Sequence, residues 1–293
     1  MFAYSLLGFS GGGQMFRTNG FLVFLLSSAS LAAAADMDGP LVGAADYYEA
    51  PVEQASLGVT GYIEGAYGSV VDSPGDIDAD AWALRGAVNF DAGGGFNLQT
   101  DLGYARASIG DADTNTYNGT LHGYYRDNLY AAGVFVQAAR LDAGFDSHIN
   151  DYMGGIEGAY FQDTWTIHGA AGYGQAGWEG FDADHYMAAL GARFYATDNV
   201  RFDVDGALDR ITDSGIDYDI RSLKLTANYR SVYFPVTLFG GYKYADEEVS
   251  GFGSSVSGDS STIFGGLRFS YGSNSIKEEE RLGPVWSNNS RAF

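Results

Sequence analysis

Few residues in this sequence have the types and spacing that chemistry needs. The chain has no cysteine and four histidines, which excludes thiol nucleophiles and cysteine-based zinc sites. His148 and His185 lie beside Asp146 and Asp184, a pairing that a hydrolase could use. Residues 172–177 match the dinucleotide pattern GxGxxG, but no helix pattern follows them, so they predict no nucleotide site. We expect no enzyme, and a hydrolase that uses one of these histidines is the alternative.

Carboxylates gather in three segments between apolar stretches. Asp111, Asp113 and Asn115 begin like a calcium-binding loop. However, Thr116 stands where the sharp turn needs glycine, and His122 stands where the bidentate glutamate belongs. Aspartate is favoured in turns by its own hydrogen bonding, so we expect neither a metal site nor a cofactor. Weak binding of divalent cations is the alternative, and it would extend to the acidic residues of the other two segments, Asp76, Asp78, Asp80, Asp213, Asp217 and Asp219.

The composition excludes two classes of protein. The chain has 293 residues and a net charge of −21, whereas nucleic-acid binding needs a basic face. Intrinsic disorder is excluded because 46% of the residues are hydrophobic and only 18% are charged. The 42 glycines, 21 tyrosines and 19 phenylalanines occur without a long apolar helix, so the regular structure must be sought in strands.

The beginning of the chain has the features of an export signal. Arg17 precedes the apolar stretch 21–35, which ends in small residues, and cleavage there would leave a mature chain beginning close to Asp36. A transmembrane anchor is the alternative, but the stretch is shorter than the ~20 residues that a helical span needs. Met15 is available as an internal start.

From residue 57 onward, apolar and polar residues alternate with a period of two, which predicts β-strands. The apolar face of most segments begins or ends in Tyr, Trp or Phe and has aliphatic residues and Gly in between. Aromatic rings prefer the two edges of a bilayer and aliphatic side chains its middle, so these faces are predicted to contact lipid. The twelve segments are 57–67, 82–90, 96–104, 117–125, 130–136, 152–160, 165–173, 186–194, 202–208, 223–229, 234–244 and 263–271.

The connectors between these segments are predicted to alternate in length. Short periplasmic turns and longer outer loops are the rule in membrane barrels, and an even number of strands places both termini on the periplasmic side. A bilayer leaves no strand edge unpaired, so the predicted fold is all-β: one closed, antiparallel, up-and-down transmembrane barrel of about twelve strands. The short connectors are 91–95, 126–128, 162–163, 196–199 and 230–231, and the longer ones are 71–80, 109–116, 141–151, 177–184, 211–217 and 245–261.

The last strand carries a more specific pattern. Gly266 is followed three and five residues later by Phe269 and Tyr271. With the strand pattern over residues 57–271, the sequence resembles the porin-like β-barrel proteins of the Gram-negative outer membrane. The resemblance implies that the barrel-assembly machinery reads Gly266, Phe269 and Tyr271 as a signal. The chain departs from this family because 22 further residues follow, and we expect 272–293 to be a periplasmic, partly disordered tail.

Charged residues fall on the opposite face of the strands, which predicts a wet lumen, because a basic residue facing lipid near the midplane costs about 2–4 kcal/mol. Glu64 is predicted to lie between Arg268 and Arg85 and to pair with either. A basic wall facing an acidic one would orient charged solutes, with an anionic-oligosaccharide path as one specialisation; the alternative is paired charges that fill the interior. The predicted lumen-lining residues are Glu64, Arg85, Asp101, His122, Glu157, Arg193, Arg201, Asp203, Asp205, Lys224, Lys243 and Arg268.

The sequence thus predicts an exported single-domain barrel over residues 57–271, after a signal region at 1–35 and a periplasmic or lumenal segment at 36–56. The expected function is passive diffusion of small hydrophilic solutes across the outer membrane of a Gram-negative bacterium. A non-conducting structural or surface-interaction barrel with acidic outer loops is the first alternative, and an outer-membrane hydrolase is the second. The expected partners are outer-membrane lipid, lipopolysaccharide, the barrel-assembly machinery and small hydrophilic solutes, but no nucleic acid.

Overall fold

Twelve strands make up most of the structure. The computed structural model describes residues 58–72, 79–109, 112–142, 148–178 and 181–286. The strands are β1 (Val59–Asp72), β2 (Ala79–Gly93), β3 (Phe96–Ile109), β4 (Ala112–Arg126), β5 (Tyr130–Asp142), β6 (His148–Phe161), β7 (Trp165–Trp178), β8 (Phe181–Thr197), β9 (Val200–Asp213), β10 (Ile216–Arg230), β11 (Val236–Gly251) and β12 (Ser254–Tyr271). In the described part, the helix α3 (Ile276–Leu282) follows the last strand.

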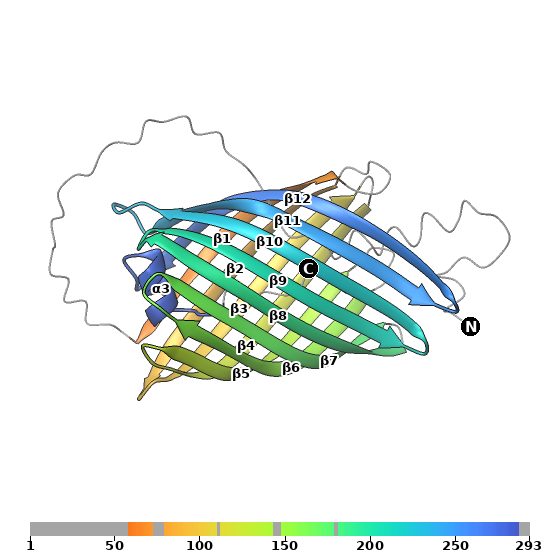
Figure 1. Cartoon of the computed structure of the whole chain (residues 1–293), viewed down its shortest axis with the longest axis horizontal. Coiled ribbons are helices and arrows are strands. Elements are labelled where there is room, and N and C mark those ends of the chain that lie inside the picture. Colours follow the sequence, from red (N-terminus) through yellow and green to blue (C-terminus); the bar gives the residue numbers. More distant parts are fainter. Residues whose placement is uncertain (1–57, 73–78, 110–111, 143–147, 179–180, 287–293) are drawn as a thin grey trace.

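The strands close into a barrel in which each one is antiparallel to both neighbours (Figure 1). They pair in sequence order, and β1 pairs with β12 to complete the ring. At this seam Glu64 lies opposite Arg268. The prediction of a closed, all-β, up-and-down barrel of twelve strands is confirmed.

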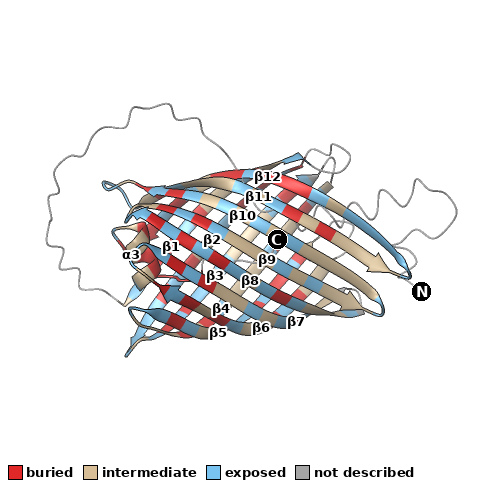
Figure 2. Ribbon diagram, viewed as in Figure 1, coloured by how far each residue is buried: buried red, intermediate tan, exposed pale blue. Residues whose placement is uncertain are grey.

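Buried and exposed residues alternate along the strands, as Figure 2 shows. The exposed positions are those predicted to contact lipid, and Leu190 in the middle of β8 is 67% exposed. Aromatic rings gather towards both ends of this outer face. Trp82, Tyr104 and Tyr117 follow one another on β2, β3 and β4 with ring centroids 5.1 Å apart at each step. Near the opposite end, the ring centroids of Tyr160 and Trp165 are 5.6 Å apart. The outer surface is therefore an aliphatic band between aromatic residues.

The strands are longer and several connectors shorter than predicted. The strands have 13 to 18 residues, more than the ~9–11 that a tilted strand needs to cross a bilayer. β11 and β12 stay paired up to Gly251 and Ser254, so the connector expected at 245–261 is mostly strand. Its turn, Phe252–Gly253, has positive φ angles of 52° and 80°, which suit a tight two-residue hairpin. The short turns lie after the even-numbered strands as predicted, whereas the longer connectors are partly or mostly strand, because paired hairpins continue beyond the apolar segments.

The two ends of the barrel are distinguished by the chain. We call the end where β1 begins and β12 ends the terminal end, and the opposite end the distal end. The turns after β2, β4, β6, β8 and β10 lie at the terminal end, and the turns after the odd-numbered strands lie at the distal end. α3 lies at the terminal end in Figure 1.

The chain after β12 is folded as far as Trp286. α3 begins after Ser275, whose hydroxyl accepts a hydrogen bond from the backbone N–H of Glu278. Val285 and Trp286 are completely buried. The expectation of a partly disordered tail outside the barrel therefore does not hold for the residues up to Trp286. Within the described residues, no helix is long and apolar enough to cross a membrane.

Candidate functional site

The charged side chains that line the lumen differ in accessibility along the barrel axis. Arg85 and Lys224, about midway, have side chains that are 20% and 27% exposed. Arg193 and Arg230, nearer the terminal end, are only 2% and 1% exposed. The lumen is thus accessible in its middle and closed at its terminal end.

Glu64 holds the seam of the barrel through two arginines. Arg268 donates hydrogen bonds to its carboxylate from Nε at 2.9 Å and from Nη2 at 2.6 Å. Nη1 of Arg85 lies 3.7 Å from the same carboxylate. The guanidinium of Arg268 also lies over the ring of Tyr62, 4.1 Å from the centroid. The predicted position of Glu64 between two cations is confirmed.

The other predicted lumen residues form local pairs. Nε of Arg201 lies 2.7 Å from the carboxylate of Asp203, two residues away on the same strand. Nζ of Lys224 lies 3.8 Å from the carboxylate of Asp205, and Lys243 stands opposite Lys224 in the β10–β11 register. Anions therefore lie among the cations on β9 and β10, and both interpretations of the interior stay predictions.

Two lumenal histidines extend these networks. His122 contacts the carboxylate of Glu157 through Nδ1 at 2.9 Å, and its Nε2 lies 3.4 Å from Asp101. Nε2 of His168 lies 3.3 Å from the carboxylate of Asp205. In the described part, both rings thus lie next to carboxylates from neighbouring or nearby strands.

The histidines that suggested a hydrolase are arranged differently from the prediction. His185 faces the lumen and contacts Asp151 at 3.0 Å and Asp209 at 3.3 Å. Its sequence neighbour Asp184 instead accepts a hydrogen bond from the hydroxyl of Tyr173 at 2.7 Å. This happens because consecutive residues of a strand point to opposite faces. Asp146, the expected partner of His148, lies outside the described residues.

The acidic segments of the distal end are tied into surface contacts. The carboxylate of Asp113 accepts hydrogen bonds from Arg106 at 2.6 Å and from Ser108 at 2.7 Å. Asp219 accepts two hydrogen bonds from Arg210, each of 2.7 Å. Among the described residues there is no group of three or more acidic or histidine side chains that could hold a metal ion. Several acidic positions and the entire N-terminal region lie outside the described residues: Asp76, Asp78, Asp111 and residues 1–57.

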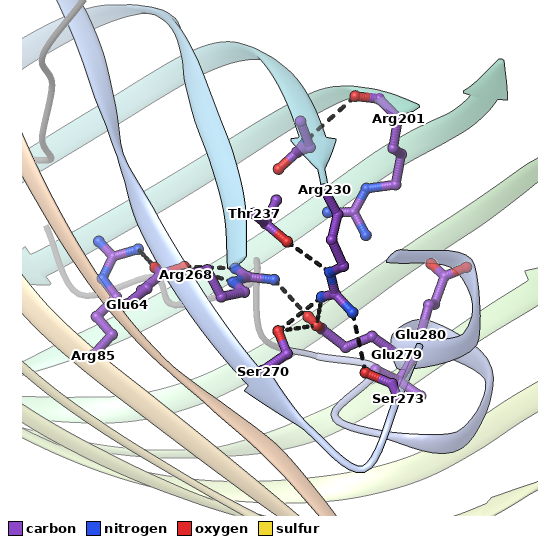
Figure 3. Close-up of polar contacts among 12 residues, drawn as sticks. Glu64, Arg85, Arg201, Arg230, Thr237, Arg268, Ser270, Ser273, Glu279 and Glu280 are labelled. Atoms are coloured by element: carbon purple, nitrogen blue, oxygen red, sulfur yellow. Dashed lines mark hydrogen bonds and ion pairs between the residues drawn. The ribbon is translucent and has the colours of Figure 1, made fainter. Parts of the chain in front are cut away.

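The segment Ser273–Trp286, which contains α3, closes the terminal end, and we call it the closing segment. Figure 3 shows Glu279 of α3 pointing at the barrel wall. Its carboxylate receives Nη2 of Arg230 and the hydroxyl of Ser270, and Nη1 of Arg268 donates to it at 2.9 Å. Arg230 in turn donates to Thr237 at 2.9 Å. Glu279 therefore sits in a cradle built by β10, β11 and β12.

The neighbouring carboxylate, Glu280, occupies a second cradle, built by β7 and β8. Nη1 of Arg193 donates to it, as do the hydroxyls of Tyr195 at 2.6 Å and Thr166 at 2.8 Å. Burial alone would raise the pKa of Glu280, but the cations Arg193 and Arg201 and the hydrogen bonds from Tyr195 and Arg193 outweigh it and lower the pKa to about 2. This carboxylate in α3 thus stays ionised at neutral pH.

The rest of the closing segment is fixed by its backbone and by Trp286. Arg126 donates to the carbonyl oxygens of Leu282 at 2.8 Å and Gly283 at 2.7 Å. The ring of Trp286 meets that of Tyr124 edge to face, with centroids 5.6 Å apart. Both rings belong to a buried apolar cluster with Ala131, Ala159, Phe161 and Val285. The segment thus contacts the inner wall on opposite sides.

Most of these closing contacts could not be predicted from the sequence. Arg230 has the same strand parity as Lys224, so the alternation could have placed it in the lumen. Glu279 and Glu280 stand in a charged run after the last strand, and no residue pattern there shows which arginines they meet. The three arginines Arg193, Arg230 and Arg268, of which two were predicted to line the lumen, are brought together by these two glutamates.

The glycine of the predicted assembly motif has a role in packing. A Cβ at Gly266 would lie 2.3 Å from the carbonyl oxygen of Gly65 and 2.7 Å from the ring of Phe239, so no side chain fits. Phe269 and Tyr271 are exposed on the outer face. Recognition of these residues by the assembly machinery stays a prediction.

Comparisons with known proteins give architectural likenesses. No protein-family model matches the sequence, and no curated protein matches it. The translocator domain of the autotransporter NalP from Neisseria meningitidis is similar in structure, with a TM-score of 0.44 and 13% identity over 74% of this chain and 90% of that one. An anion-selective porin from Comamonas acidovorans has a TM-score of 0.41 and 11% identity over 73% of this chain and 98% of that one. LpxR from Salmonella typhimurium has a TM-score of 0.40 and 10% identity over 72% of this chain and 99% of that one. Likenesses of this size describe the barrel and not its activity.

Proposed function

We propose that this chain is an outer-membrane barrel that conducts small hydrophilic solutes, and that its closing segment shuts the path at the terminal end. The observation that carries the proposal is the contrast between the two faces of the wall. Its outside is an apolar band bordered by aromatic rings, whereas charged side chains in the middle of the lumen, Arg85 and Lys224, remain accessible. Such a wall suits a bilayer outside and water inside.

The outer membrane of a Gram-negative bacterium is the proposed location, because a closed barrel of apolar exterior is one of the two structures that can cross a bilayer. The proposed partners follow from this location: outer-membrane lipid, lipopolysaccharide and the barrel-assembly machinery. The function requires diffusion only, and no reaction is assigned to the lumenal histidines.

The ion selectivity of the channel tests the proposed path, and the residues to substitute for this test lie away from the closing segment. Replacing Lys224 and Lys243 by glutamate is expected to shift the selectivity of open channels towards cations, because both positions face the accessible part of the lumen. The reversal potential of single channels in planar bilayers, under a potassium chloride gradient, measures this shift.

The matched control is the double variant Lys224→Arg and Lys243→Arg, which keeps both charges and is expected to keep the reversal potential. If the glutamate variant also leaves the reversal potential unchanged, ions do not pass these residues. If correctly folded full-length chain and a variant without the closing segment are both silent in bilayers, conduction is refuted.

A non-conducting structural or surface-interaction barrel is the second candidate function. The extensive contacts of the closing segment favour it, because they seal the terminal end with buried ion pairs. Silence of the variant without the closing segment would support this candidate.

A further inference from the structure

Without α3, the terminal end of the lumen would present a group of arginines to water. Arg193, Arg230 and Arg268 extend from β8, β10 and β12, and two of them are labelled around Glu279 in Figure 3. In the part of the chain that the structure describes, the ion pairs of Arg193 and Arg230 are formed only with Glu280 and Glu279. The closing segment therefore supplies the counter-charge of this end.

This arrangement makes release of the closing segment more favourable when another anion takes the place of its carboxylates. Removing one partner of a buried ion pair leaves an uncompensated charge, which is strongly unfavourable. Arg268 would keep Glu64, but Arg193 and Arg230 would lose their anionic partners. An anion that takes the place of the two carboxylates removes this penalty.

Both cradles have the donors that bind carboxylates. A guanidinium presents paired N–H donors in a plane that matches a carboxylate, and hydroxyl groups complete the set. Glu279 receives the hydroxyl of Ser270, and Glu280 receives those of Tyr195 and Thr166. These donors would remain on the wall when α3 departs.

We propose that the terminal end of the lumen is a binding site for solutes that carry two or more carboxylates, and that Glu279 and Glu280 occupy it as internal substitutes for such a solute. Solute binding and docking of the closing segment are then mutually exclusive. The inference rests on the proposed channel function, and it adds a substrate class and the means of opening to it.

The position of the site gives the solute a route. Lys224 and Arg85 in the middle of the lumen are accessible and basic, and they lie between the distal end and the cradles. An anion entering from the distal end meets these residues first. Because two adjacent glutamates fill the two cradles, a polycarboxylate matches the site better than chloride or a neutral solute.

Cysteine accessibility tests displacement of the closing segment directly. The chain has no cysteine, so Val285→Cys gives a single thiol at a completely buried position. Citrate is expected to accelerate its reaction with a hydrophilic maleimide by at least about tenfold, in a saturable way, whereas potassium chloride at equal ionic strength does not. Asn128→Cys, in the exposed turn after β4, is the matched control and is expected to react at one rate with or without citrate.

Direct citrate binding, measured by calorimetry, separates the cradles from the closing segment. In the full chain, Glu279→Gln with Glu280→Gln weakens the internal competitor, so citrate is expected to bind at least about tenfold more tightly. Adding Arg193→Gln and Arg230→Gln to this variant is expected to abolish binding. Because both members of each pair are then neutral, the barrel keeps no new buried charge. Arg221→Gln, a 57% exposed arginine paired with Asp246, is the control that retains binding.

Two accessibility results would each overturn the proposal: citrate that leaves Val285→Cys protected, or chloride that exposes it equally well. Unchanged citrate affinity in the Glu279→Gln and Glu280→Gln variant would also overturn it. The two proposals can fail separately. If citrate exposes Val285→Cys but the protein is silent in bilayers, the binding site is supported and the channel function is refuted. If the protein conducts but citrate has no effect, the channel function is supported and the binding site is refuted.

Discussion

A chain that ends at Gly272 is expected to conduct ions persistently in planar bilayers, whereas the full chain conducts rarely. The truncation removes α3 with Glu279 and Glu280, as well as the buried Trp286. These groups fill the terminal end, and their loss unblocks the lumen there. A barrel of twelve strands is wider than the eight-stranded kind that its own side chains fill. Single-channel recording measures the open fraction of both forms.

The double variant Glu279→Gln and Glu280→Gln gives the same test with the full chain. Breaking a buried ion pair costs about 3–5 kcal/mol, so each substitution is expected to weaken docking of the closing segment by about 10²–10⁴-fold. The control is Lys277→Gln in the same helix. Its ion pair with the 70% exposed Asp198 is a surface contact, which contributes little. An unchanged open fraction after truncation and after the double substitution would show that the closing segment does not block the lumen.

Leu190→Arg is expected to prevent stable insertion of the barrel into lipid. Leu190 is 67% exposed and lies between Gly169 of β7 and Gly206 of β9, in the aliphatic band of the outer face. A basic residue facing the middle of a bilayer costs about 2–4 kcal/mol. Reversible unfolding by urea in phospholipid vesicles measures the loss of stability.

The control for this substitution places the same residue on the other face. Ser222→Arg points into the lumen, one residue from Leu223, which pairs with Gly206. It is expected to cost far less than Leu190→Arg, because the new charge meets water. Equal losses for the two variants would mean that the outer face does not contact lipid.

The barrel could be predicted from the sequence because the alternation of apolar and polar residues is visible within each strand. Alternation with a period of two tells which of two adjacent residues faces lipid, so Leu190 and Arg193 are assigned to opposite faces without knowing any contact. The seam pair of Glu64 and Arg268 follows once closure is accepted, because the first and last strands must then be neighbours. Strand ends were predicted less well, because hairpins extend beyond the apolar segments and stay paired through backbone hydrogen bonds.

The closing segment could not be predicted in the same way. α3 has only seven residues, too few to establish a helical period. Its ion pairs join residues far apart in sequence: Glu280 is 87 residues from Arg193, and Glu279 is 49 residues from Arg230. A run of charged residues after the last strand could equally lie in solvent or in a basic cavity. Only the arrangement of the barrel in space shows that its inner wall holds the complementary arginines.

The closing segment contacts both sides of the seam, and this determines the order of steps in folding. Its Leu282 carbonyl oxygen accepts a hydrogen bond from Thr60 on β1, while Glu279 is held by Ser270 on β12. The first and last strands are separated by nearly the whole barrel, and contacts of such sequence separation form late in folding. Until they meet, the closing segment has only part of its binding surface, so its docking is expected to follow closure of the ring.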